Sequence, residues 1–111
     1  MSAAGDSRPH AQLAFRHDEK RHRYVAELDG AEVAFSEVDV IMAKSFLIKH
    51  TEVASAHEGR GYGTALMRHI LGEAREQGRT VIPICPFAKE YVRRHPEYLE
   101  LVRPDFRSAI G

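Results

Sequence analysis

A glycine-rich segment at residues 57–64, His-Glu-Gly-Arg-Gly-Tyr-Gly-Thr, carries the first chemical signal in the chain. Gly59, Gly61 and Gly63 stand at alternate positions, so no Cβ atom there obstructs a ligand that approaches the backbone. A helical pattern follows directly, and the unpaired N–H groups of a first helical turn attract phosphate oxygens. The segment therefore predicts a phosphate site, with a tight strand-to-helix turn as the alternative. A nucleotide-triphosphate P-loop is excluded because no Gly-Lys-Ser/Thr follows.

Cys85 is the only cysteine, so an internal disulfide is excluded. Pro86 follows it and suits the first position of a helix, which places the thiol at a helix N-cap. The helix dipole favours the thiolate there, and a thiolate is a nucleophile that could form a covalent intermediate. The alternative is a small, inert cysteine that packs in the core.

Glu52 and His50 lie two residues apart in an expected strand and therefore share one of its faces. A carboxylate can act as a general base, and a neighbouring histidine can relay the proton. Ordinary strand residues without a chemical role are the alternative. The seven histidines are scattered, without His-x-x-x-His spacing and with a single cysteine, so no metal site is expected.

Hydrophobic residues recur with two spacings, the alternation of a strand and the longer period of a helix, and these predict the elements that position the residues named above. Alternation indicates strands at 13–17, 23–28, 33–38 and 46–53, with Asp29-Gly30 as a two-residue hairpin turn. Helical spacing from Tyr62 to Ala74 ends at Gly78, which suits a helix C-terminus. A strand at 81–84 and helices at 87–94 and around 98–101 follow. In the fourth strand, strict alternation gives one face Leu47, Lys49, Thr51 and Val53, and the other Phe46, Ile48, His50 and Glu52.

The predicted order is β-β-β-β-α-β-α, an α/β protein of the α+β kind. Antiparallel amino-terminal strands run into a right-handed β-α-β crossover whose two strands are parallel, and a carboxyl-terminal helix follows. The 111 residues suffice for one domain. We expect a disordered tail at 1–11, the domain at 12–102 and a second tail at 103–111.

Composition narrows the class of protein. Sixteen basic residues balance sixteen acidic ones, so neither nucleic acid nor an anionic membrane is an expected partner. No apolar run is long enough to span a bilayer, and the first residues lack the apolar region of a signal peptide. A lone cysteine fits a reducing, cytoplasmic location.

Three stretches resemble the GNAT superfamily of N-acetyltransferases, and more closely its short stand-alone GNAT-like domain family. They are residues 50–53 (HTEV), 59–66 (GRGYGTAL) and 83–91 (PICPFAKEY), joined by 95–98 (HPEY). The superfamily's pyrophosphate loop reads Gln/Arg-x-x-Gly-x-Gly/Ala, which aligns Glu58, Gly61 and Gly63 with its fixed positions. Glu58 departs from that pattern, so its carboxylate should point away from the phosphates.

The resemblance implies an acetyl-CoA cosubstrate and its binding residues. Backbone amides of Arg60, Gly61, Tyr62, Gly63 and Thr64 would hold the pyrophosphate, and main chain near Val53 would meet the thioester carbonyl. Related enzymes place a tyrosine near Tyr91 to protonate the departing thiolate, although the spacing here is one residue short. Lys89, Arg93 and Arg94 could meet the 3′-phosphate, or simply be solvated helix charges.

The expected function is acetyl transfer from acetyl-CoA to an unidentified amine by direct attack, with Glu52 or a water as the base. Transfer through an acetylated Cys85 is the second mechanism. A non-catalytic CoA-binding or interaction module is the rival class, because the elements that build the acceptor side in full-size GNAT enzymes are missing. A second copy of the chain could complete that side.

Overall fold

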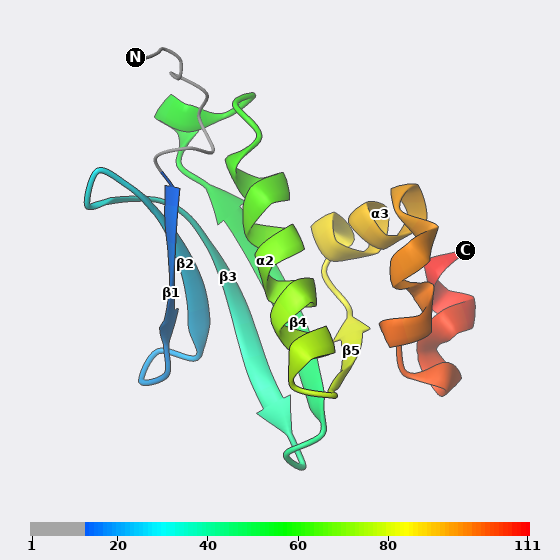
Figure 1. The fold of residues 1–111 in the computed structure, drawn as a ribbon. Coiled ribbons are helices and arrows are strands. Elements are labelled where there is room, and N and C mark those ends of the chain that lie inside the picture. Colours follow the sequence, from blue (N-terminus) through cyan, green and yellow to red (C-terminus); the bar gives the residue numbers. More distant parts are fainter. Residues whose placement is uncertain (1–12) are drawn as a thin grey trace.

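The computed structural model describes residues 13–111, so the tail expected at 1–11 lies outside the described residues. Five strands, two α-helices and three 3₁₀ helices follow one another along the chain (Figure 1). Their bounds are β1 Leu13–Asp18, β2 Arg23–Leu28, β3 Ala31–Ile41, β4 Ser45–Val53, η2 Ser55–His57, α2 Tyr62–Glu76, β5 Thr80–Pro83, α3 Pro86–Arg94, η3 Pro96–Leu101 and η4 Pro104–Ile110.

The strands form one sheet in chain order, β1-β2-β3-β4-β5. Pairs from β1 to β4 are antiparallel and the β4–β5 pair is parallel, which confirms the predicted topology. Asp29 and Gly30 have φ values of 51° and 84°, as their hairpin turn requires. The third strand extends past its predicted end at Val38, because Glu37 and Asp39 are the outward residues of a continuing strand.

A β-bulge in β4 overturns the predicted faces of that strand. His50 pairs with Glu37 and Ile48 pairs with Val38, which leaves Lys49 as an extra residue without a partner in β3. One extra residue reverses the alternation beyond it. Two sets result: Phe46, Ile48, Thr51 and Val53 face α2, and Leu47, His50 and Glu52 face the opposite side.

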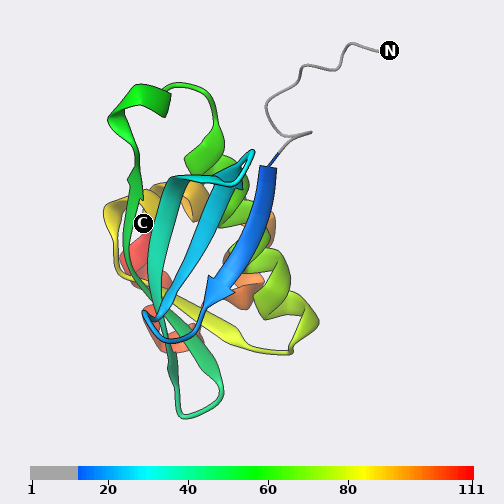
Figure 2. The same ribbon diagram turned by 90° about the vertical axis from the view of Figure 1, so that its left-hand side faces the viewer.

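Helix α2 covers one face of the sheet through its apolar stripe. The side chains of Leu66, Met67, Ile70, Leu71 and Ala74 are fully buried, as the helical spacing predicts. Figure 2, in which the β1 edge faces the viewer, shows α2 on one side of the sheet. Within residues 13–111, no helix packs closely against β1, β2 or β3 on the other side. One face of these strands therefore stays open to solvent.

The prediction of a tail at 103–111 is wrong. Val102 pairs with Val81 at the outer edge of β5, and Arg103 N–H donates to the Val81 carbonyl at 3.0 Å. Helix η4 follows, and Ile110 packs in the core at 6% exposure. Phe106, in the same helix, is partly buried and packs against the core.

Candidate functional site

The glycine loop leaves the first turn of α2 without a cap. Gly59 and Gly61 have φ values of 81° and 82°, a left-handed conformation that favours glycine. Gly61 is the N-cap residue and provides no side-chain cap. The first helical bond runs from Ala65 N–H to the Gly61 carbonyl at 3.0 Å. The three N–H groups before it, at residues 62–64, find no acceptor within residues 13–111. They form an anion-attracting helix start.

A hollow of about 210 Å³ opens in front of these groups. Val53 and residues 61–64, five of the six predicted cofactor-binding residues, line it, whereas Arg60 does not. Glu58 is exposed and lies outside the lining, as its carboxylate charge led us to expect. The lining residues are Val53, His57, Gly59, Gly61, Tyr62, Gly63, Thr64 and Phe87. Sequence reasoning missed His57 and Phe87, because neither belongs to a motif with a phosphate-binding role.

Gly63 is a glycine for a reason that the sequence did not indicate. A Cβ atom on Gly63 would lie 2.9 Å from Phe87 Cζ and 2.9 Å from Val53 Cγ2. These separations are shorter than the contact distance of roughly 3.5–4.0 Å between carbon atoms. Gly63 therefore lets the start of α2, the end of β4 and the first turn of α3 meet.

Strands β4 and β5 separate beside this hollow. Their pairing ends at Ile48 and Pro83, and the Ile48 carbonyl then accepts from Ile84 N–H at 3.1 Å and Cys85 N–H at 3.2 Å. Residues 49–53 of β4 continue without a partner in β5. The main chain of this segment is the place where the resemblance puts a thioester.

Cys85 is the N-cap residue of α3, as predicted. Its Sγ accepts from Ala88 N–H at 3.3 Å and lies 3.6 Å from Thr51 Oγ1. Thr51 in turn shares a 2.9 Å hydrogen bond with the buried Ser36. Cys85 is only 3% exposed, so its side chain both caps the helix and fills the core. The thiol nevertheless stands beside the free segment of β4.

His50 and Glu52 form an exposed pair on the face opposite α2. His50 Nε2 and Glu52 Oε2 are 2.9 Å apart, which confirms that they share a face. Glu52 also lines a shallow hollow of about 150 Å³ with Glu32, Phe35 and Ala54. Because Glu52 and Val53 are consecutive strand residues, the two hollows lie on opposite faces at the end of β4.

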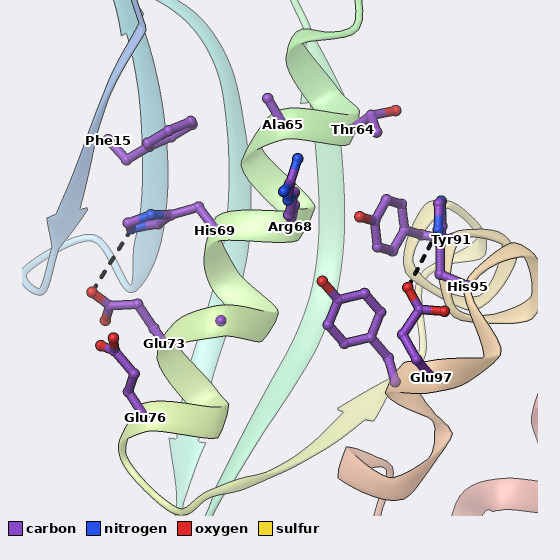
Figure 3. A pocket seen from close by; sticks show the side chains of 12 residues that line it. Phe15, Thr64, Ala65, Arg68, His69, Glu73, Glu76, Tyr91, His95 and Glu97 are labelled. Carbon is purple, nitrogen blue, oxygen red and sulfur yellow. Dashed lines mark ion pairs between the residues drawn. The ribbon is translucent and has the colours of Figure 1, made fainter. Parts of the chain in front are cut away.

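A larger groove of about 700 Å³ follows the exposed side of α2 (Figure 3). We call it the α2 groove; its lining residues are Phe15, Thr64, Ala65, Arg68, His69, Gly72, Glu73, Glu76, Tyr91, His95, Glu97 and Tyr98. Burial and the neighbouring Tyr98 raise the pKa of Tyr91 to about 12. Tyr91 thus keeps its proton at neutral pH, but it lines this groove and not the hollow at Val53.

Among residues 13–111, no group of three or more His, Cys, Asp or Glu side chains is arranged to hold a metal ion. No helix in the same range is long and apolar enough to cross a bilayer.

Comparison with protein families gives a match over most of the described chain. The model of the GCN5-related N-acetyl-transferases matches residues 23–101. Protein NATD1 of Gallus gallus is 29% identical over 95 residues, which cover 83% of this chain and 86% of that protein. Human Protein NATD1 is 28% identical over the same length, covering 83% and 84%.

Solved structures share the fold. A solution structure of a GCN5-like protein from Staphylococcus aureus matches with a TM-score of 0.65 at 21% identity, covering 84% of this chain and 90% of that one. N-acetylglutamate synthase from Neisseria gonorrhoeae, in complex with coenzyme A and N-acetyl-glutamate, matches with a TM-score of 0.52 at 21% identity. That match covers 68% of this chain and 19% of the synthase. The fold class expected from the resemblance is confirmed.

Proposed function

The chain belongs to the GCN5-related N-acetyl-transferase family, and from this premise we propose that it binds acetyl-CoA and transfers the acetyl group to an amine by direct attack. The uncapped start of α2 carries the proposal. Three N–H groups, which find no acceptor within residues 13–111, belong to residues that line a hollow reaching Val53 on β4. Pyrophosphate oxygens would satisfy these groups, and glycine at 59 and 61 keeps the approach clear.

The two faces of β4 divide the reaction between cosubstrate and acceptor. The pantetheine arm would run from the loop along residues 51–53, whose β5 side has no strand partner. Main-chain N–H groups there could polarise the thioester carbonyl. The acceptor would approach from the open face, where Glu52 and His50 lie.

The amine needs a base before it can attack. Glu52 would take a proton from the ammonium form, and His50 would hold the carboxylate in place through their hydrogen bond. The amine nitrogen then bonds to the carbonyl carbon and gives up its surplus proton to water, the C–S bond breaks, and CoA leaves as a thiolate that takes a proton from water. The products are an acetamide and CoA.

A second mechanism passes through Cys85, and one contact favours it. Its Sγ lies 3.6 Å from Thr51 Oγ1, on the same strand segment that would hold the thioester. In this mechanism the Cys85 thiolate takes the acetyl group as the C–S bond of acetyl-CoA breaks and CoA leaves, and the amine then attacks the acetyl group and releases the Cys85 thiolate.

Thermal shift with a small ligand panel tests the binding claim. Acetyl-CoA and CoA should raise the melting temperature, and ATP and NAD at equal concentration should not. At a hundredfold excess over Kd, binding adds about 2.7 kcal/mol to the free energy of unfolding. No shift with acetyl-CoA or CoA would refute the proposed function.

A matched pair of variants tests the loop itself. Gly61→Asn places a side chain at the uncapped helix start, and asparagine tolerates the left-handed conformation better than other residues. Gly30→Asn makes the same change at a hairpin with φ +84°, away from the hollow. Gly61→Asn should weaken acetyl-CoA binding and Gly30→Asn should not. Equal affinities in both would mean that the loop serves only as a turn.

A further inference from the structure

A cavity of about 1060 Å³ lies at the end of the sheet opposite the glycine loop. Figures 1 and 2 both show the β3–β4 hairpin extending beyond the end of α2 and beyond the β1–β2 turn, and the cavity occupies the space beside this extension. We call it the hairpin notch. Its lining includes Val38, Val40 and Phe46 from the hairpin, Gln77 and Arg79 from the turn after α2, and His22 from the β1–β2 turn. The volume is large enough for a small molecule, whose sites measure roughly 300–1,000 Å³.

The hairpin notch is separate from the proposed site of acetyl transfer. Phe46 lines the notch and Val53 lines the glycine-loop hollow, and the strand between them is roughly 20 Å long. The notch shares no lining residue with that hollow or with the α2 groove. A ligand in the notch is therefore neither the cosubstrate nor a small amine placed for attack.

Arg79 carries a charge in the notch that the fold leaves without an acceptor. Its Nη1 atom is buried and has no hydrogen-bond partner within residues 13–111. Its guanidinium carbon lies 5.5 Å from the centroid of the Phe46 ring, and a ring face attracts the cation but replaces no hydrogen bond to oxygen. Buried polar atoms without a partner are rare because they are unfavourable. The arrangement therefore favours an acceptor that comes from outside the chain.

The other charged groups of the notch are already matched or exposed to water. Lys49 Nζ lies 3.0 Å from Asp39 Oδ2, and His22 Nδ1 lies 3.5 Å from Asp39 Oδ1. The Glu19 side chain is 85% exposed, so solvent screens its carboxylate. Arg79 is thus the cation that a ligand can match, and a single negative charge is enough to balance it.

The remaining surface of the notch suits an apolar group. Val38 and Val40 face the same side of the sheet as Phe46, and all three line the cavity. Val40 is 43% exposed, so a ligand that covers it removes apolar surface from water. The planar guanidinium matches the two oxygens of a carboxylate. An acid whose carboxylate is attached to an apolar ring or chain meets both parts of the lining.

We propose that the hairpin notch binds a small monocarboxylic acid with an apolar body. Arg79 donates hydrogen bonds to the carboxylate, and the apolar body lies against Val38, Val40 and Phe46. The Arg79 side chain is partly exposed, and rotation about its bonds turns the buried Nη1 to the ligand.

An amide NMR titration of the full chain with benzoate, benzamide and inorganic phosphate tests this site. Benzoate should shift the signals of Val40, Gln77 and Arg79 in a saturable way. Benzamide has the same shape without the charge and should bind roughly tenfold more weakly, since hydrogen bonds between charged groups are the stronger ones. Equal affinity for benzoate and benzamide, or tighter binding of phosphate than of benzoate, would overturn the proposal. Benzoate shifts confined to residues 61–64 would also overturn it, because they would place the acid at the glycine loop.

Two variants and one control test the residues of the notch. Arg79→Gln should weaken benzoate binding roughly tenfold or more. Arg75→Gln makes the same change at an arginine that pairs with Glu100 outside the notch, and it should keep the parent affinity. Val40→Glu leaves the contact between Arg79 and Phe46 intact and places a repelling carboxylate at an exposed position, so it too should weaken benzoate binding. Unchanged affinity in Arg79→Gln would refute the site, and if that variant does not fold, unchanged affinity in Val40→Glu would do so.

The notch does not depend on the proposed function. Saturating CoA should leave benzoate affinity unchanged, because the glycine-loop hollow and the notch have no lining residue in common. If benzoate binds at Arg79 and acetyl-CoA does not bind at all, the notch stands and acetyl transfer falls. If CoA displaces benzoate, the acid occupies the cosubstrate's site and the notch proposal is wrong.

Discussion

Replacing Gly63 by alanine should test how tightly β4, α2 and α3 are joined at the site. The new Cβ would lie 2.9 Å from both Phe87 Cζ and Val53 Cγ2, at least roughly 0.6 Å inside the usual contact distance. Overpacking of this kind costs about 1–3 kcal/mol. Alanine recovers up to about 1 kcal/mol through its helix propensity. The expected net loss is about 0–2 kcal/mol, because the partly exposed Phe87 ring can move aside.

A double-mutant cycle identifies the collision. Urea unfolding of the parent, Gly63→Ala, Phe87→Ala and the double variant gives the four free energies of unfolding. If the Phe87 ring is the obstacle, Gly63→Ala should cost less, or even stabilise, in the Phe87→Ala background. A net loss of 1 kcal/mol corresponds to roughly 4–8 °C in melting temperature, which thermal unfolding can confirm. An equal cost in both backgrounds would refute the role of Phe87 and leave Val53 as the obstacle.

Three other predictions concern side chains near the site. Glu52→Gln should lower kcat by about 10²–10⁴-fold without changing acetyl-CoA affinity; an unchanged pH–rate profile would assign the proton to water. Cys85→Ala should lower the free energy of unfolding, since it removes the α3 cap, but it should keep part of the activity. Complete loss of activity, together with an acetyl adduct on the parent protein by mass spectrometry, would favour the cysteine mechanism. Because burial and Tyr98 raise the pKa of Tyr91 to about 12, above its usual value of roughly 10, Tyr91 contributes stability that is present below about pH 10 and is lost as the pH rises through about 12. Tyr91→Phe should therefore lose less stability than the parent across that range in urea unfolding, and an identical loss would contradict the role of burial.

Local signals predicted most of the fold. The Asp29-Gly30 turn, the apolar stripe of α2 and the Pro86 start of α3 depend on neighbouring residues, and all three are present. The glycine loop and the N-cap position of Cys85 were predictable for the same reason. Their geometry follows from backbone conformation within a few residues.

Features set by distant contacts could not be predicted in this way. Phe87 reaches Gly63 and Val53 only after α2 and α3 pack together, and nothing in its own neighbourhood indicates that contact. Helix η4 looked like a tail because a short, polar segment gives little periodic signal, although Ile110 reaches the core. The α2 groove was missed because it combines residues of four elements.

Substitution and deletion of Lys49 should have very different effects on the protein. Its side chain is exposed and pairs with Asp39 at 3.0 Å, so most substitutions there should cost little. Deleting the residue would instead remove the bulge and return Thr51 and Val53 to the solvent side, while His50 and Glu52 turned toward α2. A substitution scan would therefore rank this position among the most permissive of β4, and a deletion scan among the least. Homologous sequences aligned with a gap at this point should be expected to have lost the site along with the residue.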